Sequence, residues 1–346
     1  MTMRTSARLL ARAFQDGVTA DIRQRSLEVK VSEPTTVGGY DLAANPPTSA
    51  VSKLAPTAAG GSGWLAVYAE LFKARLTSLV LLTTTVGFYV GFQGPVDYAL
   101  LCRTLLGTAL LAGGAAALNQ LMEREYDAKM RRTQGRPLPA GRLRPRTVLI
   151  AGCAAVMLGM ICLAVTINFV AGAVGALSLV CYLFIYTPLK RVTWLNTLVG
   201  AIAGALPPVI GWTAARGGLS STGLFLFAIQ ACWQLPHFMA IAWIYRDEYA
   251  HAGFKMLPVL DPQGRRTGRQ AFGYTLALLV ASVGPFLCHL AGPIYLASAL
   301  ILGTLFVWLA FQFAVAPAVA RARHLFYASL LYLPLLLAMM VVDKLK

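Results

Sequence analysis

Long apolar runs recur along this chain, and they constrain its fold more than any other feature. Each run is about 18 to 24 residues long, which at 1.5 Å per residue matches a hydrocarbon core of roughly 30 Å. Only 13% of the residues are charged and 57% are hydrophobic, whereas an average soluble chain has about 25% charged residues. The bilayer is therefore the predicted solvent.

We predict an all-α polytopic membrane protein with about nine transmembrane helices around a central cavity. Membrane strands would alternate in segments of about ten residues, whereas these runs are apolar on every face. The expected spans are 76–92, 98–120, 147–167, 169–188, 194–214, 222–245, 271–291, 294–316 and 325–342.

Basic residues are concentrated in alternate loops, where short segments rich in Lys and Arg remain cytoplasmic. The intervening loops contain a single basic residue, Arg216. This asymmetry predicts a cytoplasmic N-terminus, and it accounts for much of the +16 net charge without a nucleic-acid partner. The basic residues of the predicted cytoplasmic loops are Arg124, Lys129, Arg131, Arg132, Arg136, Arg142, Arg144, Arg146, Lys190, Arg191, Arg246, Lys255, Arg265, Arg266, Arg269, Arg321 and Arg323.

The first 62 residues differ in composition, being rich in Pro, Gly, Ser, Thr and Ala. We expect a disordered cytoplasmic extension over 1–62 and the membrane domain over 63–346. Two interpretations of the extension remain open. Arg4 and Arg8 fit a mitochondrial transit peptide, but Asp16, Asp21 and Glu28 do not,. We favour the bacterial cytoplasmic (inner) membrane, with the mitochondrial inner membrane as the alternative.

Three oxygen-bearing side chains follow one another at the end of the second predicted span. Asn119, Glu123 and Asp127 stand four residues apart, so a continuing helix places them on one face over about 12 Å. Mg²⁺ binds a few carboxylate or carbonyl oxygens together with waters and substrate phosphates. This ladder of Asn119, Glu123 and Asp127 is therefore a predicted site for Mg²⁺ and a diphosphate.

The alternative for this region is a solvated helix end, and Glu125 with Lys129 fits that interpretation. Ionisable groups this close to a membrane span nevertheless favour a functional role for the ladder. Arg131 and Arg136 follow it and offer planar donors for phosphate oxygens. Their alternative role is to set the topology.

A second group, Lys190 and Arg191, follows the fourth predicted span. Pro188 interrupts a regular helix there, so alignment of Tyr186 with Lys190 on one face cannot be assumed. The two cations are predicted to stabilise a diphosphate as it leaves.

His237 and Asp247 form a third group, within and just after the sixth predicted span. His237 lies in an apolar helix beside Pro236 and is either a packing residue or a ligand. Asp247 is the carboxylate best placed to face the ladder, with a metal or phosphate role.

Taken together, these segments resemble the intramembrane, UbiA-type prenyltransferases and, within them, the protohaem farnesyltransferases, or haem O synthases. The resemblance covers about residues 65–342. Its motifs are the ladder with Met130-Arg131-Arg132-Thr133 and Arg136-Pro137-Leu138, Tyr186-Thr-Pro-Leu-Lys190-Arg191, Gly204-Ala-Leu-Pro207-Pro208, Trp233 to Phe238, and Met256-Leu257-Pro258-Val259.

The resemblance implies transfer of farnesyl from farnesyl diphosphate to a vinyl group of haem B, within the lipid bilayer. It assigns Mg²⁺ as cofactor, Asn119, Glu123 and Asp127 as its ligands, and Lys190 as a catalytic cation. Haem A synthase or other oxidase assembly factors are expected partners. The diphosphate-binding residues it implies are Arg131, Arg136, Arg191, Lys73 and Arg75. His237 is the candidate for contacting haem iron.

Two departures from the family pattern bear on the site. The family usually has Lys-Pro-Arg before the first span, whereas this chain has Lys73-Ala74-Arg75, which puts a kink there in doubt. Quinone-type relatives carry a second Asp-x-x-x-Asp after the sixth span, whereas here Asp247 is followed by His251. That change favours the haem branch and leaves a second magnesium site in doubt.

Two other functions remain as alternatives. One is a prenyltransferase with a quinone, chlorophyll or other aromatic acceptor. The other is a transporter or lipid-binding protein, although transporters usually place ionisable groups at the bilayer midplane.

Overall fold

The computed structural model describes residues 63–345, and within them nine helical segments are long and apolar enough to cross a membrane. The only strand-like pairing in this part of the chain is an isolated bridge between Ala291 and Lys344. The spans are α3 (Ala74–Gly91), α4 (Tyr98–Asp127), α5 with a π-helical end (Pro145–Ile167), α6 with a π-helical end and α7 (Phe169–Leu189), α8 and α9 (Asn196–Arg216), α10 (Ser221–Ile244), α13 (Arg265–Leu287), α14 (Pro293–Val315) and α15 (Val319–Val342).

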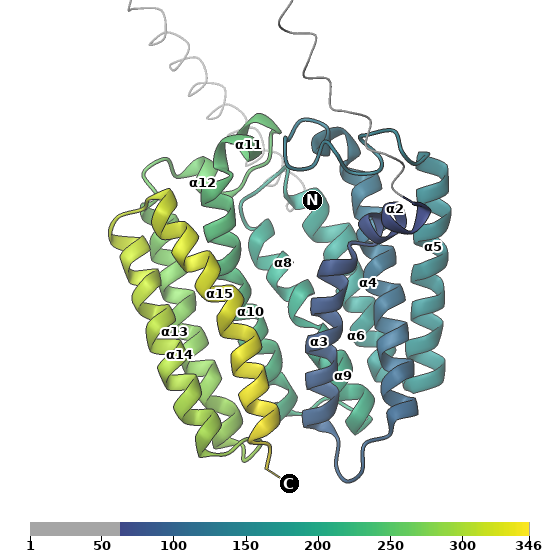
Figure 1. Ribbon diagram of the computed structural model, residues 1–346, viewed down its shortest axis with the longest axis vertical. Coiled ribbons are helices and arrows are strands. Elements are labelled where there is room, and N and C mark those ends of the chain that lie inside the picture. The colour runs from purple at the N-terminus through teal and green to yellow at the C-terminus, as the bar shows by residue number, and fades with distance from the viewer. Residues whose placement is uncertain (1–62, 346) are drawn as a thin grey trace, which may run out of the picture. The chain divides into compact units, whose positions relative to one another are not determined.

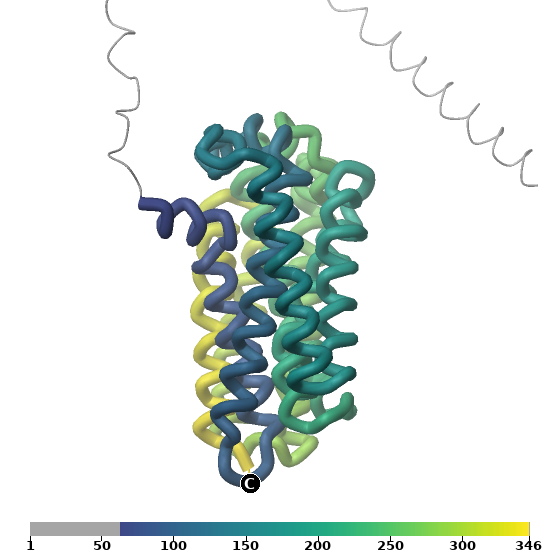
Figure 2. The backbone as a smooth tube through the Cα atoms, turned by 90° about the vertical axis from the view of Figure 1, so that its right-hand side faces the viewer, coloured from purple at the N-terminus to yellow at the C-terminus, as the bar shows by residue number. Residues whose placement is uncertain are grey.

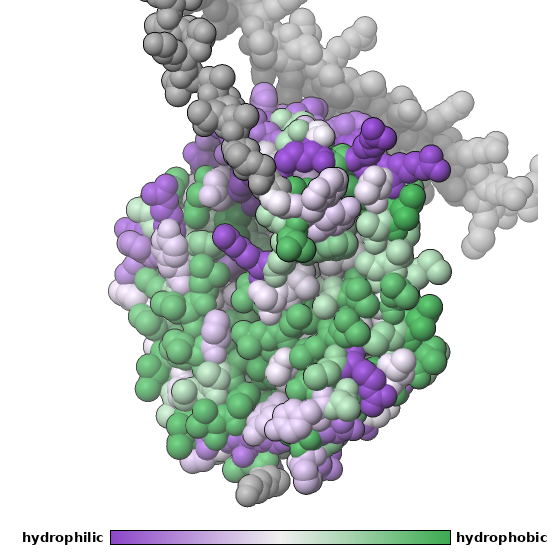
Figure 3. Space-filling model, turned by 45° about the vertical axis from the view of Figure 1, so that its right-hand side comes forward, coloured by the Kyte–Doolittle hydropathy of each residue, from purple (hydrophilic) through white to green (hydrophobic). Residues whose placement is uncertain are grey.

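The long helices run side by side, and the short helices α11 (Arg246–His251) and α12 (Leu257–Leu260) lie at one end of them (Figure 1). Figure 3 shows mostly apolar side chains across the middle of the face in view, with polar side chains gathered toward both ends. The all-α membrane fold predicted from the apolar runs is confirmed, and the chain is an integral membrane protein. The predicted extension over 1–62 lies outside the described residues.

Several helices extend beyond their apolar cores into the charged loops. The second span was predicted to end at residue 120, but α4 continues to Asp127 and carries the ladder with it. Similarly, α13 begins at Arg265 rather than at 271. The buried Asp261 carboxylate accepts hydrogen bonds from the backbone N–H (2.8 Å) and hydroxyl (3.0 Å) of Thr267, which satisfies donors in the first turn of α13,.

Glycines allow α3 and α9 to approach closely, as small residues commonly do in membrane helices. A Cβ at Gly87 would overlap the carbonyl oxygen of Pro208, and a Cβ at Gly211 would overlap that of Thr84. This pair of helices is therefore a fixed part of the scaffold.

A short helix that was not predicted, α2 (Trp64–Leu71), precedes the first span and lies across the direction of the long helices (Figure 2). Trp64 and Leu65 are 75% and 88% exposed, as expected for a helix at the membrane–water interface,. The Gln120 side chain donates to the carbonyl of Leu71 at 2.6 Å. Helix α2 is thus attached to the helix that carries the ladder.

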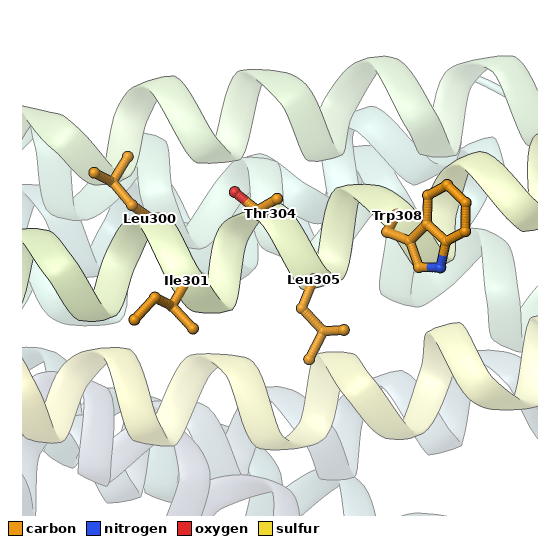
Figure 4. A pocket seen from close by; sticks show the side chains of 5 residues that line it. All are labelled: Leu300, Ile301, Thr304, Leu305 and Trp308. Carbon is orange, nitrogen blue, oxygen red and sulfur yellow. The ribbon is translucent and has the colours of Figure 1, made fainter.

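An apolar surface pocket lies on α14, lined by Leu300, Ile301, Thr304, Leu305 and Trp308 (Figure 4). Its apolar side chains are 44–70% exposed, as expected where a helix faces lipid tails. None of the candidate site residues lines it, so it has no part in the chemistry discussed below.

Candidate active site

The ladder lies on one face of α4, because that helix is continuous through Asp127,. Asn119 is 1% exposed, Glu123 3% and Asp127 1%. Burying ionised carboxylates is costly unless each has a partner. The partners come from three other parts of the chain.

The first partner is Lys73, whose ammonium donates to Asn119 Oδ1 at 3.2 Å. Lys73 adopts a left-handed backbone conformation (φ 47°) between α2 and α3. The chain therefore bends at this point although it has alanine where the family usually has proline. Burial, together with the nearby cations Arg136 and Lys190, lowers the pKa of Lys73 to about 7,.

Asn119 is also held from its other side, by a residue that the sequence analysis did not identify. Its amide Nδ2 donates to the Thr187 hydroxyl at 3.1 Å, and that hydroxyl donates to the carbonyl of Tyr182 at 2.8 Å. The orientation of the Asn119 amide, with its oxygen toward Lys73, is therefore fixed.

The second partner is Lys190, which lies 2.8 and 3.1 Å from the two carboxylate oxygens of Glu123. Its ammonium also lies 4.4 Å from the centre of the Tyr186 ring. Burial alone would lower the pKa of Lys190, but Tyr186 and Glu123 outweigh it and raise the pKa above the ordinary lysine value. Lys190 is therefore a fixed positive charge.

Tyr186 and Lys190 meet despite Pro188, because one helical turn still connects them. Residues Cys181–Tyr186 form a π-helical segment that leads into α7 (Thr187–Leu189). The backbone N–H of Lys190 still donates to the carbonyl of Tyr186, at 3.2 Å. π-Helical turns of this kind occur frequently at functional sites.

The backbone of Lys190 is held by the segment that contains Lys255 and by α8. The N–H of Lys255 donates to the Lys190 carbonyl at 2.8 Å. In turn, the buried Asn196 side chain donates to the carbonyls of Lys255 (3.2 Å) and Thr193 (2.6 Å). Neither Asn196 nor Lys255 was identified from the sequence as a site residue.

The third partner is Arg136, whose guanidinium lies 2.6 Å from Asp127 Oδ2. The loop between them is closed by Thr133, whose hydroxyl donates to the Asp127 carbonyl at 2.8 Å. Every member of the ladder thus has its own cation.

Two charged loops join over the ladder's end of the molecule. Arg132 donates to the Tyr249 hydroxyl at 3.0 Å, and its backbone N–H contacts Glu248 at 3.4 Å. Its guanidinium also lies 5.3 Å from the Tyr245 ring. The segment after α4 is therefore bound to α11 (Arg246–His251).

Some predicted site residues are not part of this cluster. Arg75 and Arg131 have exposed side chains. Arg191 donates to the Met122 carbonyl at 3.0 Å and lies 4.2 Å from the Tyr126 ring, on the face of α4 next to the ladder. The Asp247 side chain is 98% exposed and lies 3.6 Å from Arg246. Its metal role stays a prediction that no contact supports.

His237 lies in a packed aromatic layer between α10 and α15. Its ring stacks on Trp233 (5.0 Å between ring centres) and approaches Phe326 (5.1 Å). Its Nδ1 lies 2.7 Å from the Ser329 hydroxyl oxygen. The sequence left open whether His237 is a packing residue or a ligand. Both roles are compatible with this structure, because the hydrogen bond of His237 uses Nδ1 and not Nε2.

The donor set of the ladder suits Mg²⁺, a hard cation that prefers oxygen ligands. Residues 63–345 contain no cluster of three or more His, Cys, Asp or Glu side chains that would form a complete cage. One amide and two carboxylates would leave coordination positions for water and substrate phosphates. Lys190 and Arg136 balance the two carboxylates, and Lys73 adds a positive charge when it is protonated, a form that an anionic ligand would favour.

The fold and this site define an intramembrane prenyltransferase. The sequence profile of the UbiA prenyltransferase family matches residues 80–337, and the chain belongs to that family. Its curated relatives include the protoheme IX farnesyltransferases of Solibacter usitatus, 46% identical over 80% of this chain and 98% of the relative, and of Koribacter versatilis, 41% identical over 86% and 99%. The mitochondrial protoheme IX farnesyltransferase of Arabidopsis thaliana is 36% identical over 85% of this chain and 68% of the relative.

Solved structures share the fold at low sequence identity. A digeranylgeranylglyceryl phosphate synthase has a TM-score of 0.70 at 15% identity, over 81% of this chain and 98% of that one. A UbiA homologue from Archaeoglobus fulgidus bound to GPP and Mg²⁺ has a TM-score of 0.56 at 17% identity, over 79% and 99%. These likenesses establish the architecture of the chain.

Proposed function

We propose that this protein transfers the farnesyl group of farnesyl diphosphate to a vinyl group of haem B, giving haem O and diphosphate. The observation that carries the proposal is the buried ladder on α4, in which Asn119, Glu123 and Asp127 each face a cation. Membership of the UbiA family and the names of the relatives support the reaction class and the acceptor.

The cations of the ladder would bind the diphosphate. Lys73, Lys190 and Arg136 now neutralise or hydrogen-bond the ladder oxygens, and their ammonium and guanidinium groups suit phosphate oxygens equally well. Arg131, exposed at the same end, is a further phosphate contact. Arg75 and Arg191 stay predictions for this role, since Arg191 is engaged with α4.

Asn119, Glu123 and Asp127 would hold Mg²⁺, which would leave their partner cations free to face the substrate. When bound, the metal neutralises negative charge on the diphosphate and so makes it a better leaving group. The three ladder residues would fix the position of the metal and the diphosphate, because they lie along one face of a single helix.

Transfer needs the allylic carbon–oxygen bond of farnesyl diphosphate to break as the leaving group gains charge. The fixed positive charges of Lys190 and Arg136 stabilise that charge, as preorganised cations do. The terminal vinyl carbon of haem B forms the new bond to farnesyl C1. One water then adds to the adjacent cationic carbon and loses a proton, so haem B, farnesyl diphosphate and water give haem O and diphosphate.

His237 would bind the acceptor through the haem iron. Packed against Trp233 and Phe326 and bonded to Ser329, it is held in one orientation within the membrane span. An imidazole held in this way is a common axial ligand to haem iron.

We place the ladder's end of the molecule at the cytoplasmic side, because the basic loops lie at that end. The bacterial cytoplasmic membrane is the favoured location and the mitochondrial inner membrane the alternative, since relatives come from both. Haem A synthase and other oxidase assembly factors are the proposed partners. Residues 63–346 would form the catalytic unit.

The test is an acceptor comparison with membranes that contain the full chain. Farnesyl diphosphate and Mg²⁺ are supplied with either haem B or 4-hydroxybenzoate, and products are identified by mass. Formation of haem O with release of diphosphate is the expected result. Prenylation of 4-hydroxybenzoate alone would reassign the acceptor, and no diphosphate release with either would favour a transporter.

A further inference from the structure

The hydroxyl of Ser329 on α15 sits between two groups that compete for its single hydrogen. It donates to the carbonyl of Phe326 at 2.6 Å, within its own helix. It also lies 2.7 Å from Nδ1 of His237 on α10. A carbonyl oxygen can only accept, so both contacts are hydrogen bonds at the same time only when the hydroxyl donates to Phe326 and accepts from Nδ1 of His237,.

This pair of hydrogen bonds selects one tautomer of His237. With the Ser329 hydrogen used, the oxygen of Ser329 can only accept from His237, so Nδ1 must carry the ring proton. In a neutral imidazole the other nitrogen, Nε2, then keeps its lone pair. No hydrogen bond joins Nε2 to another of the residues that the structure describes.

Ser329 is itself fixed in place by α10. The indole N–H of Trp233 donates to the Ser329 carbonyl at 2.7 Å, and the Trp233 ring stacks on His237. Ser329 is completely buried, and the Phe326 ring lies 5.1 Å from the imidazole. The orientation and the tautomer of His237 are therefore both set by the α10–α15 contact.

A histidine that binds a metal through one nitrogen almost always donates from the other to a fixed acceptor, and that contact tunes the affinity. The arrangement around His237 has this form, without a carboxylate that would add charge within the membrane span.

We infer that Ser329 is a positioning residue for the acceptor, which holds His237 in the tautomer whose Nε2 binds haem iron. The inference rests on the proposed function, because haem B is the proposed acceptor. It adds that affinity for the iron porphyrin depends on a residue of α15, a helix that contributes neither a ladder residue nor a cation bonded to one.

The experiment titrates haem B into the purified full-length protein in nanodiscs and records the Soret and visible bands. The variants are Ser329→Ala, Ser329→Thr and His237→Ala, with Ser282→Ala as the matched control. Ser282 is also a buried serine, bonded to the Tyr332 hydroxyl of α15 at 2.9 Å. KM values for haem B and for farnesyl diphosphate are measured in parallel.

Ser329→Ala should shift the bands and weaken haem binding about tenfold or more, as loss of such a supporting contact does. The KM for farnesyl diphosphate should not change, and Ser329→Thr should restore the spectrum. Ser282→Ala should behave as the wild type. Unaltered bands and affinity in Ser329→Ala, or the same change in Ser282→Ala, would overturn the inference.

The result for the wild type separates this inference from the proposed function. If the wild type makes haem O and His237→Ala keeps the wild-type spectrum, the inference is wrong and the function stands. If the wild type neither binds haem B nor makes haem O, both are wrong.

Discussion

The ammonium of Lys190 lies 2.8 and 3.1 Å from the two carboxylate oxygens of Glu123, although 67 residues separate them in the chain. Their side chains are 16% and 4% exposed. The pair joins the end of α4 to the end of the fourth span, and it places a positive charge where the proposed diphosphate leaves. In the proposed mechanism the pair would therefore contribute both to folding and to chemistry.

Replacing Lys190 by methionine should separate these two contributions. The variant leaves the Glu123 carboxylate buried without its cation, which costs about 3 kcal/mol. We expect a lower thermal unfolding midpoint in detergent and at least about a hundredfold loss of turnover, the scale of losing one preorganised charge-stabilising group.

The double variant Glu123→Gln/Lys190→Met provides the control. It removes both charges, so stability should recover while activity does not, and its activity is compared with that of Glu123→Gln alone, because that ladder variant is itself expected to lose activity. Recovery of activity together with stability would show that Lys190 has only a structural role.

Arg131 should act on substrate binding alone. Its side chain is exposed at the ladder's end of the molecule, so Arg131→Gln removes a phosphate contact without exposing a buried partner. We expect the KM for farnesyl diphosphate to rise about tenfold, the value of one charge-assisted hydrogen bond, with the unfolding midpoint unchanged. Arg124→Gln, also exposed, should leave KM at the wild-type value, and an equal rise in both variants would mean a general effect of surface charge.

Thr187 should control the orientation of the Asn119 amide. Thr187→Val keeps the shape of the side chain but removes the hydroxyl that accepts from Asn119 Nδ2. We expect about a tenfold fall in turnover, because a misoriented amide presents nitrogen where the ladder needs oxygen. Thr108→Val on α4 is the matched control, since the buried Thr108 hydroxyl has no hydrogen-bond partner in the described structure. Full activity in Thr187→Val would refute the role.

Gly211 should tolerate no side chain. A Cβ there overlaps the carbonyl of Thr84, so Gly211→Val must separate α3 from α9. We expect destabilisation of about 3 kcal/mol, seen as a lower unfolding midpoint in detergent. Gly273→Val in α13, where a Cβ would meet nothing within 4 Å, should be nearly neutral, and equal stability of the two variants would contradict the close approach.

The fold could be predicted from the sequence because membrane-spanning helices are defined by length and polarity, which are local properties. Helix ends were less predictable. Helix α4 continues past residue 120 because its polar last turns face cations from other segments. Helix α13 starts at Arg265, and the Asp261 carboxylate accepts from the backbone N–H of Thr267 in its first turn. The short helix Trp64–Leu71 has too few residues to give a periodic signal.

The ladder could also be predicted, since its four-residue spacing is local, but its partners could not. Lys73 reaches Asn119 through a left-handed conformation that lysine rarely adopts,. The Tyr186–Lys190 contact follows a π-helical segment, and no residue pattern in the sequence predicts such a segment. Thr187 and Ser329 are hydroxyl-bearing residues in apolar runs, with nothing in the sequence to mark them. Their hydrogen bonds to Asn119 and His237 are visible only once the helices are packed.

The most direct test of the central claim is Mg²⁺-dependent formation of haem O by the wild type, by Asp127→Asn and Glu123→Gln, and by Glu125→Gln. Glu125 lies on the same helix as the ladder, but its side chain is 77% exposed. Haem O and diphosphate should form with the wild type and with Glu125→Gln, and both ladder variants should lose at least about a hundredfold in rate while still inserting into membranes. A folded Asp127→Asn variant that forms haem O at the wild-type rate would contradict the proposed role of the ladder.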